Sequence, residues 1–315
     1  MGSALAFASA LPAAQAWPTA PIRLIVPYGA GGTADLLSRE VAARLQKELG
    51  ATVAVENQLG AGSTTATALL AQGGPDAEHT ILMASSGHST GPLMYKDLGY
   101  DPVKDFRFIR NIIEIPNVMT VPASSPYDSV AAFIEAAKKK PLTFSSSGGG
   151  SSIHMSALLF MAMTGTRMAH VPLASSAEVR SSLLSGEVDV AFDNLPAVLE
   201  PIRAGQLKAL AVTSRQPSPY LPGVGSLAAL GAEYGLADFV VTAWFGLIAD
   251  EGMSPEAAAR LQTALDKIMA DDSFRAFVVK MGAKPAEQAG AAFRDYVAED
   301  VRRWQRVAGQ VHLAD

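Results

Sequence analysis

A glycine-rich loop is the first segment of the chain that could carry chemistry. It reads Gly29-Ala30-Gly31-Gly32-Thr33-Ala34 and matches the G-x-G-x-x-A pattern of dinucleotide-binding folds. Glu56 ends the next predicted strand, where a ribose-binding acid belongs. Thr33 and Asp35 instead suit a helix cap and a first-turn acid, and that carboxylate would oppose a pyrophosphate. Under either interpretation the loop places backbone N–H groups at a helix N-terminus, where an anion can bind. The remaining alternative is an ordinary tight turn that binds nothing.

A second loop of the same kind lies near the middle of the chain. Residues 145–152 read Ser-Ser-Ser-Gly-Gly-Gly-Ser-Ser and again join a predicted strand to a predicted helix. Three glycines let the backbone approach a ligand, and the serine hydroxyls add neutral donors, although a flexible loop tip has the same composition. Open α/β sheets bind ligands outside the carboxyl ends of their strands. We therefore interpret the two loops as a clamp on one small anion.

The segment Gly87-His88-Ser89-Thr90-Gly91 matches G-x-S-x-G, the nucleophile motif of many hydrolases. In such an enzyme Ser89 would stand on a strand-to-helix turn, followed later in the chain by an acid and a histidine. Pro92 follows this motif directly, and the segment up to Tyr95 is short for the helix that such a turn requires. A serine hydrolase stays an alternative, and the other interpretation is a polar loop that lines a cleft.

Composition excludes several classes of function. Lys and Arg number 25 against 30 Asp and Glu, so the net charge of −5 argues against a nucleic-acid partner. The chain has no cysteine, which excludes disulfides, thiol catalysis and iron–sulfur clusters. Its five histidines show no metal-ligand spacing, so we expect no metal and no cofactor. A chain that is 49% hydrophobic and 17% charged is not disordered.

The first sixteen residues are interpreted as the remnant of an export signal. Residues 4–16 are small and apolar, and Ala14-Gln15-Ala16 fits the A-x-A cleavage pattern, although the basic n-region is missing. A frayed alanine-rich tail is the alternative. No run reaches the ~18 apolar residues of a membrane span. We expect an exported protein.

Strand-like and helix-like segments alternate in two series, which indicates βαβ units and mainly parallel sheets. The first series has strands 22–26, 52–55 and 80–84 and helices 34–49 and 63–71. The second has helices 129–140, 153–164, 176–184 and 197–204 and strands 142–145, 168–171, 188–192 and 208–213.

The last part of the chain is predicted to return to the first series. Residues 214–235 are rich in Pro, Gly and Ser and predict irregular structure, and 239–248 form an extended run. The helical tail beyond them has no sheet of its own to pack on. We therefore predict an α/β fold of two lobes, each a mainly parallel sheet flanked by helices, joined by two hinge strands near 118–122 and 242–247. The predicted domains are 1–16, the export remnant; 17–122 plus 246–315, lobe 1; and 123–245, lobe 2.

Several short motifs follow one another in a fixed order along the chain. They are Pro27-Tyr28-Gly29-Ala30-Gly31-Gly32-Thr33-Ala34-Asp35, Val55-Glu56-Asn57 with Gly60-Ala61-Gly62, Tyr100-Asp101-Pro102-Val103-Lys104-Asp105-Phe106, His170-Val171-Pro172, Phe192-Asp193-Asn194-Leu195-Pro196, Leu210-Ala211-Val212-Thr213 and Trp244-Phe245-Gly246-Leu247. The ordered set is more specific than any one motif, and it resembles a known family, the Bug receptors of tripartite tricarboxylate transporters. The resemblance runs from about Trp17 to the end of the chain.

The resemblance implies a two-lobed periplasmic binding protein of the type II-like kind, without catalysis. It implies a small organic carboxylate held between the lobes and delivered to membrane transporter subunits, and we expect a monomer. A nucleotide-dependent α/β enzyme that uses residues 29–34 is the alternative. By position, the ligand-facing residues would be Tyr28, Gly31, Gly32, Thr33, Asp35, Ser63, Ser86, His88, Ser89, Ser147, Gly148, Ser151, Ser152, His154, Pro172 and Asp193.

The chain departs from the family pattern near the expected cleft. Leu173-Ala174-Ser175 stands where the family usually has Tyr-Lys-Gly or Tyr-Arg-Gly, and Gln58 and Leu59 interrupt the usual Glu-Asn-Arg-Pro-Gly. These changes remove cationic and aromatic groups, which favours a less charged or aromatic acid. Asp35 would repel a carboxylate unless it binds a ligand amine or points away, and the sequence leaves both open.

Overall fold

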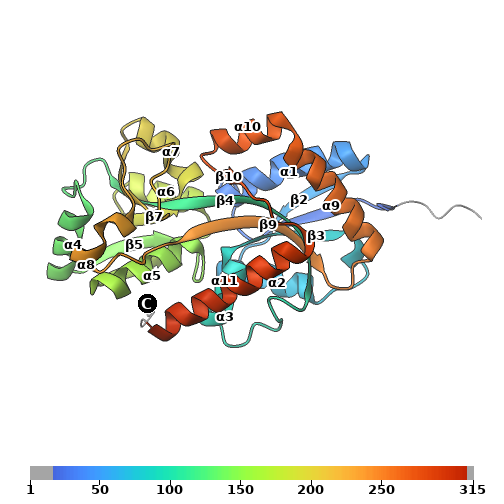
Figure 1. Ribbon diagram of the computed structural model, residues 1–315, viewed down its shortest axis with the longest axis horizontal. Coiled ribbons are helices and arrows are strands. Elements are labelled where there is room, and N and C mark those ends of the chain that lie inside the picture. Colours follow the sequence, from blue (N-terminus) through green and yellow to red (C-terminus); the bar gives the residue numbers. More distant parts are fainter. Residues whose placement is uncertain (1–16, 311–315) are drawn as a thin grey trace, which may run out of the picture.

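The computed structural model describes residues 17–310, whose strands form a ten-stranded sheet shared by two lobes (Figure 1). The strand order is β2-β1-β3-β9-β4-β7-β5-β6, with β8 and β10 (Lys284–Pro285) paired to β4. β4 (Phe106–Pro122) belongs to both lobes, because residues 106–116 pair with β9 (Thr242–Asp250) and residues 117–122 pair with β7 and β8. This long strand therefore connects the two lobes directly.

Lobe 1 is built on three parallel strands, most of whose β-branched residues are buried. Helix α1 ends at Gly50, which has a left-handed φ of 66° that suits glycine at a helix C-terminus. The elements are β1 (Ile22–Val26), α1 (Thr33–Leu49), β2 (Val53–Asn57), η1 (Ala61–Ser63), α2 (Thr64–Ala71), η2 (Ala77–His79), β3 (Thr80–Ser85) and α3 (Ser86–Met94).

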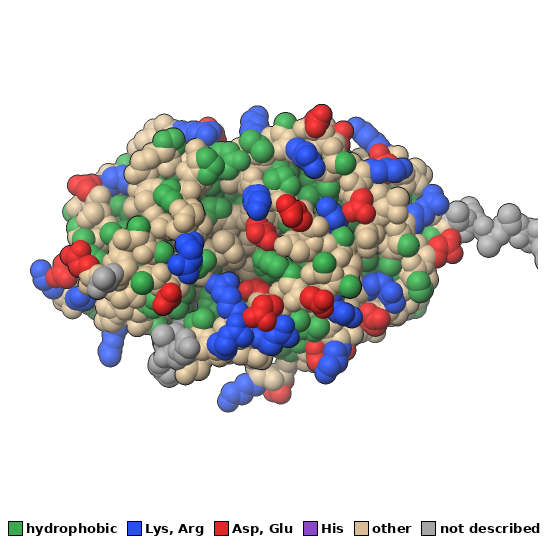
Figure 2. Space-filling view, viewed as in Figure 1, with side chains coloured by type: hydrophobic (Ala, Val, Ile, Leu, Met, Phe, Trp, Pro, Cys, Tyr) green, Lys and Arg blue, Asp and Glu red, His purple; other side chains and the backbone are tan. Residues whose placement is uncertain are grey.

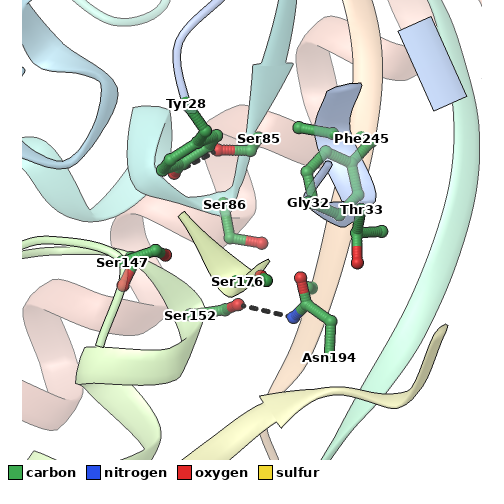
Figure 3. Close-up of a pocket in the computed structure, with 13 residues that line it drawn as sticks. Tyr28, Gly32, Thr33, Ser85, Ser86, Ser147, Ser152, Ser176, Asn194 and Phe245 are labelled. Carbon is green, nitrogen blue, oxygen red and sulfur yellow. Dashed lines mark hydrogen bonds between the residues drawn. The ribbon is translucent and has the colours of Figure 1, made fainter. Parts of the chain in front are cut away.

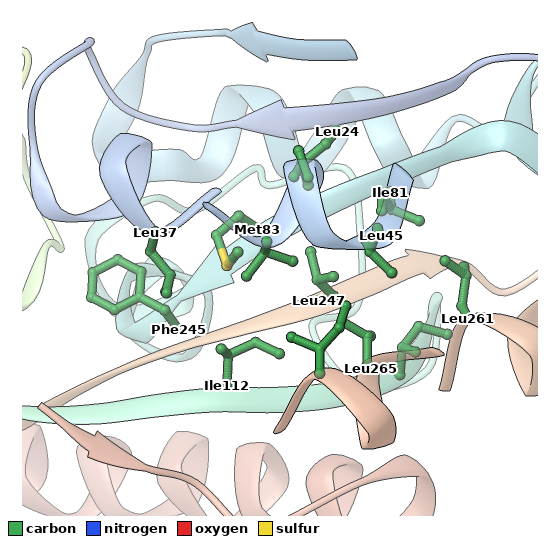
Figure 4. Close-up of a cluster of buried hydrophobic side chains, with 14 of the residues drawn as sticks. Leu24, Leu37, Leu45, Ile81, Met83, Ile112, Phe245, Leu247, Leu261 and Leu265 are labelled. Carbon is green, nitrogen blue, oxygen red and sulfur yellow. The ribbon is translucent and has the colours of Figure 1, made fainter. Parts of the chain in front are cut away.

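The core of lobe 1 lies between α1, the sheet and the C-terminal helix α9 (Pro255–Ala270). Figure 4 shows Leu37 of α1 close to Met83 and Phe245 of the sheet, all of them buried. Leu261 and Leu265 of α9 close the cluster from the other side. Helix α9 is therefore packed on the first lobe.

Lobe 2 repeats the plan with three parallel strands and their own core. Fully buried Phe144, Phe160 and Phe192 lie in this core. The elements are α4 (Val130–Lys139), β5 (Leu142–Ser146), α5 (Ser152–Thr164), β6 (Met168–Pro172), α6 (Ser176–Leu184), β7 (Val190–Asn194), α7 (Leu195–Arg203), β8 (Leu207–Val212), η3 (Leu227–Leu230) and α8 (Gly231–Tyr234).

The last helix, α11 (Gly290–Gln310), crosses from one lobe to the other (Figure 1). Its Phe293 and Val297 lie in a lobe 1 core cluster, whereas Trp304 lies in the core of lobe 2. The helix α10 (Asp272–Lys280) precedes it. Acidic and basic side chains are intermixed on the face that Figure 2 shows. Among residues 17–310, no helix is both long and apolar enough to cross a membrane.

Most predicted elements agree with the structure to within a few residues, and helix 176–184 agrees at both ends. The predicted sheets are parallel only in part, because β4 and β9 run antiparallel to their neighbours. Helix α3 was not predicted; it begins at Ser86, so Ser89 lies inside it and only a short stretch of helix follows. The predicted export segment 1–16 lies outside the described residues.

Candidate functional site

Five helix N-termini converge on one small chamber between the lobes. Two belong to lobe 1, at the starts of α1 and α3, and three to lobe 2, at the starts of α5, α6 and α7. The cavity has a volume of about 20 Å³, so it holds only a small group. We call it the inner chamber; Tyr28, Gly32, Thr33, Ala34, Ser85, Ser86, Ser147, Ser151, Ser152, Ser176, Asn194, Ala243 and Phe245 line it (Figure 3).

The convergence follows from the order of strands and helices. Each of these helices follows a strand directly or through a short loop, and the strands β1, β3, β5, β6 and β7 all end at the chamber. Small residues, Gly32, Ser85, Ser151, Ser175 and Asn194, stand at the five N-caps. Because a helix N-terminus carries about half a positive charge, the five together make a strong site for an anion.

The lining is polar but carries no formal charge on any of its thirteen described residues. The Tyr28 hydroxyl shares a hydrogen bond of 2.9 Å with Ser85 Oγ, and burial raises the Tyr28 pKa, which keeps the hydroxyl protonated. Thr33 Oγ1 is buried and has no hydrogen-bond partner in the described protein. Figure 3 shows its hydroxyl directed into the space that the Asn194 side chain also faces. A buried hydroxyl without a partner points to a ligand that would supply one.

Asp35 points away from the inner chamber. Its Oδ2 accepts the Gly31 N–H at 3.0 Å, its Oδ1 accepts Asn57 Nδ2 at 2.9 Å, and Arg39 forms an ion pair with it at 2.8 Å. Burial opposes the charged form, but these partners outweigh it and hold the pKa below the ordinary value. Asp35 and Gly31 therefore brace the first loop from behind, and neither lines the chamber.

Asp193 lies directly behind the chamber, next to Asn194, and is fully buried. Burial raises its pKa to about 7, although the Asn194 N–H at 2.7 Å, the Ser176 hydroxyl and Arg180 counteract part of that rise. Asn194, and not Asp193, reaches the chamber, where its Nδ2 donates to Ser152 Oγ at 3.3 Å. The carboxyl thus fixes the donors at the starts of α6 and α7 from behind.

We expect Asp193→Asn to remove a pH dependence of stability. A folded-state pKa near 7, above the unfolded value of about 4, means that the stability from this group is complete below about pH 4. It is lost as pH rises to about 7. Urea unfolding should show the variant gaining about 2–4 kcal/mol on the native protein between pH 4 and pH 8. A constant difference between the two proteins across that range would contradict this.

The two histidines of the predicted site are buried beside the chamber rather than in its wall. His88 packs against Tyr100 and Phe106, its Nε2 lies 2.6 Å from the Pro102 carbonyl oxygen, and burial lowers its pKa to about 4. His154 Nδ1 accepts the Gly150 N–H at 3.1 Å and so holds the second glycine loop in shape. Both are positioning residues by geometry.

Ser89 and Ser63 also lie outside the inner chamber. Ser89 is inside α3 and its hydroxyl lies beside the Asp300 carboxyl of α11, so it is not exposed at a strand-to-helix turn. Ser63 is buried at the start of α2, against Gly87. Among the described residues, no group of three or more His, Asp or Glu side chains could hold a metal ion.

A larger cavity of about 490 Å³ adjoins the inner chamber, and we call it the outer chamber. Tyr28 and Ser147 line both cavities. Two further residues of the predicted site, Gly148 and Pro172, line the outer chamber only. The second glycine loop, residues 145–152, therefore contributes lining residues to both the inner and the outer chamber.

The lobes touch at several points around these chambers. The Gly29 N–H donates to the Ala174 carbonyl at 3.0 Å, and Tyr95 Oη donates to the Gly149 carbonyl at 3.3 Å. Gly62 of lobe 1 lies so close to lobe 2 that a Cβ there would stand 1.7 Å from the Gly149 oxygen. The structure is thus a closed form, with its glycine loops in contact.

The predicted list of ligand-facing residues omits several residues that line the inner chamber, and three of these had a signal in the sequence. Ser85 and Asn194 end strands just before helices, and Ser176 is the first helical residue inside the capping-box pattern of Ser175 and Glu178. Ala243 and Phe245 come from β9, in an apolar run whose inward positions the pattern alone does not identify.

Two α/β lobes that close around an enclosed anion site define a solute-binding protein of the periplasmic kind. The chain belongs to the family described as tripartite tricarboxylate transporter family receptor (TctC), whose model matches residues 37–313. BugT of Bordetella pertussis is 30% identical over 93% of this chain and 90% of its own. The structure of R. palustris Rpa4515 with adipate has a TM-score of 0.87 and 32% identity, covering 94% of this chain and 99% of that one. The periplasmic binding protein BugD has a TM-score of 0.88 and 28% identity, covering 93% and 98%.

These findings confirm the family predicted from the sequence motifs, the binding-protein fold, the receptor function and the periplasmic location. The family is one of receptors and not of enzymes, so the nucleotide-dependent enzyme and the hydrolase were wrong alternatives. The local geometry agrees. Glu56, the residue that would bind a ribose in a dinucleotide site, instead forms an exposed ion pair with Arg23 at 2.9 Å.

Proposed function

We propose that this receptor captures a small organic carboxylate between its lobes and presents it to the membrane subunits of a tripartite tricarboxylate transporter. The inner chamber holds the carboxylate group. The moving units are residues 17–122 with 246–315, and residues 123–245. The observation that carries the proposal is the convergence of five helix N-termini, from both lobes, on one uncharged cavity.

The energetics suit reversible binding. Each helix N-terminus contributes ~0.3–1 kcal/mol to an exposed anion and up to ~2 kcal/mol to a partly buried one. Together they offset the desolvation of a carboxylate without a salt bridge. Closure of the two lobes then excludes water and brings the two sets of N-termini together. Such a site releases its ligand when the lobes separate, as transport requires.

A thermal-shift screen of mono- and dicarboxylates, amino acids and NAD(H) tests this function. An acid at 100 times its Kd should add about 2.7 kcal/mol to the free energy of unfolding, and NAD(H) should add nothing. Thr33→Val keeps the shape of the side chain but removes the unpartnered hydroxyl. Because hydrogen bonds to charged groups contribute ~1.5–3 kcal/mol, the variant should bind the acid about 10- to 100-fold more weakly.

The matched control is Thr263→Val, since Thr263 Oγ1 donates to the Ala259 carbonyl on the exposed side of α9. It should bind the acid as the native protein does. A screen in which no acid stabilises the protein, or in which NAD(H) does, would overturn the proposed function. Unchanged affinity in Thr33→Val would remove that hydroxyl from the site.

A further inference from the structure

We propose that the outer chamber holds an uncharged, apolar tail of the bound acid, so that the receptor selects monocarboxylates with hydrocarbon or aromatic tails over dicarboxylates. The inference rests on the proposed function, because it assumes that the inner chamber holds the carboxylate group. It follows from the sizes, the walls and the charges of the two chambers.

The sizes divide a ligand into two parts. With about 20 Å³, the inner chamber accommodates a head group and little more. The outer chamber, at about 490 Å³, is of the size that small-molecule sites usually have. Tyr28 and Ser147 stand between the two spaces. An acid of more than a few carbon atoms must therefore extend from the inner chamber into the outer one.

The walls of the outer chamber are more apolar than polar. Leu59 and Tyr95 line it from lobe 1, and Pro172 and Leu173 line it from lobe 2. Leu59 is 47% exposed, so its apolar side chain is accessible to a ligand that enters this chamber. The two leucines thus place apolar side chains on both lobes of the chamber.

The charges disfavour a second carboxylate in the tail. None of the described residues that line the outer chamber is a lysine, an arginine or a histidine, and Glu178 is its one acid. Glu178 Oε2 accepts the Ala174 N–H at 3.1 Å. A distal carboxylate would therefore lose hydration against apolar walls and approach a fixed negative charge, with no cation in return.

Three acids of one chain length separate the possibilities: hexanoate, with a neutral tail; adipate, with a negative one; and 6-aminohexanoate, with a positive one. Isothermal titration of the native protein should give hexanoate at least a tenfold lower Kd than adipate and a lower Kd than 6-aminohexanoate. Benzoate against terephthalate repeats the comparison with an aromatic tail. The same order is expected in both series.

A single wall residue should reverse the preference. Leu59→Arg places a cation in the outer chamber, and the ratio of the adipate to the hexanoate Kd should fall at least tenfold. Leu59→Gln, which is polar but uncharged, is the control and should leave adipate the weaker ligand. Because Leu59 is on the surface, both variants should fold.

The outcomes are distinct. If adipate binds as tightly as hexanoate, or if 6-aminohexanoate binds most tightly, the selection of an uncharged tail is wrong while the carboxylate receptor stands. If none of the acids binds, although other ligands from the screen do, the tail assignment is overturned as well. If no acid of any kind binds, the proposed function itself fails.

Discussion

Gly62→Ala should abolish tight ligand binding while leaving the fold intact. A Cβ at this position would stand 1.7 Å from the Gly149 oxygen across the lobe interface, so the two glycine loops could not close against each other. The lobe 1 and lobe 2 helix N-termini would then stay apart, and water would remain between them. We expect the Kd of the best acid to rise at least about 100-fold, equivalent to about 2.7 kcal/mol. Calorimetry measures the affinity, and small-angle X-ray scattering should show no ligand-induced decrease in radius of gyration.

Gly50→Ala is a matched control for the backbone. Gly50 has φ 66° and ψ 26°, almost the same left-handed conformation as Gly62 at φ 60° and ψ 32°. A Cβ at Gly50 has no atom within 4 Å, so it strains the backbone without touching lobe 2. The two variants should lose similar stability, of the order of 1 kcal/mol. Equal ligand affinity in both would show that the Gly62 contact does not govern closure.

Ser152→Asp should eliminate carboxylate binding and raise the melting temperature of the ligand-free protein. Ser152 is the first residue of α5 and lines the inner chamber, so the new carboxylate would lie where the ligand's carboxylate is proposed to bind. The same N-termini that attract the ligand would then stabilise the side chain. With a gain of ~1–2 kcal/mol, differential scanning calorimetry should show a rise of about 2–4 °C.

Ser152→Asn separates charge from volume. Its amide fills the same space as the carboxylate but is neutral, so it should block the ligand without raising the melting temperature. A melting temperature that falls equally in both variants would mean that the chamber does not favour an anion. Retained acid binding in Ser152→Asp would place the ligand elsewhere.

The elements were largely predictable because their signals are local. Apolar periodicity and a terminal glycine define α1, and the sequence Ser254-Pro255-Glu256 marks the start of α9, where Ser254 Oγ accepts the Ala257 N–H at 3.1 Å. Helix α3 was missed because Pro92 and two glycines argue against a helix by propensity. Tertiary contacts override that preference. Ser86 Oγ accepts the Trp244 N–H at 2.9 Å, and Thr90 Oγ1 donates to the Gly150 carbonyl.

The glycine loops of the candidate site were predictable from the sequence, but the number of helix N-termini around it was not. Two glycine-rich loops indicated an anion between two lobes, whereas the structure brings three further helix N-termini to the same place. Which side chains face the chamber depends on helix phase and strand register. Asp35 faces Arg39 and Asn57, and Asn194 rather than Asp193 faces the cavity. No spacing in a single sequence distinguishes those neighbours.

The bridging helix α11 limits how this receptor can open. Trp304 is buried in one half of the molecule, Phe293 in the other, and Asp300 between them accepts the Trp244 indole N–H at 3.0 Å. A straight α-helix neither stretches nor shortens by more than a little. The halves can therefore swing about this rod but cannot be pulled apart along it. The lobes can rotate apart only until the indole of Trp304 would have to leave the lobe 2 core. The packing of this one side chain therefore limits how wide the cleft can open.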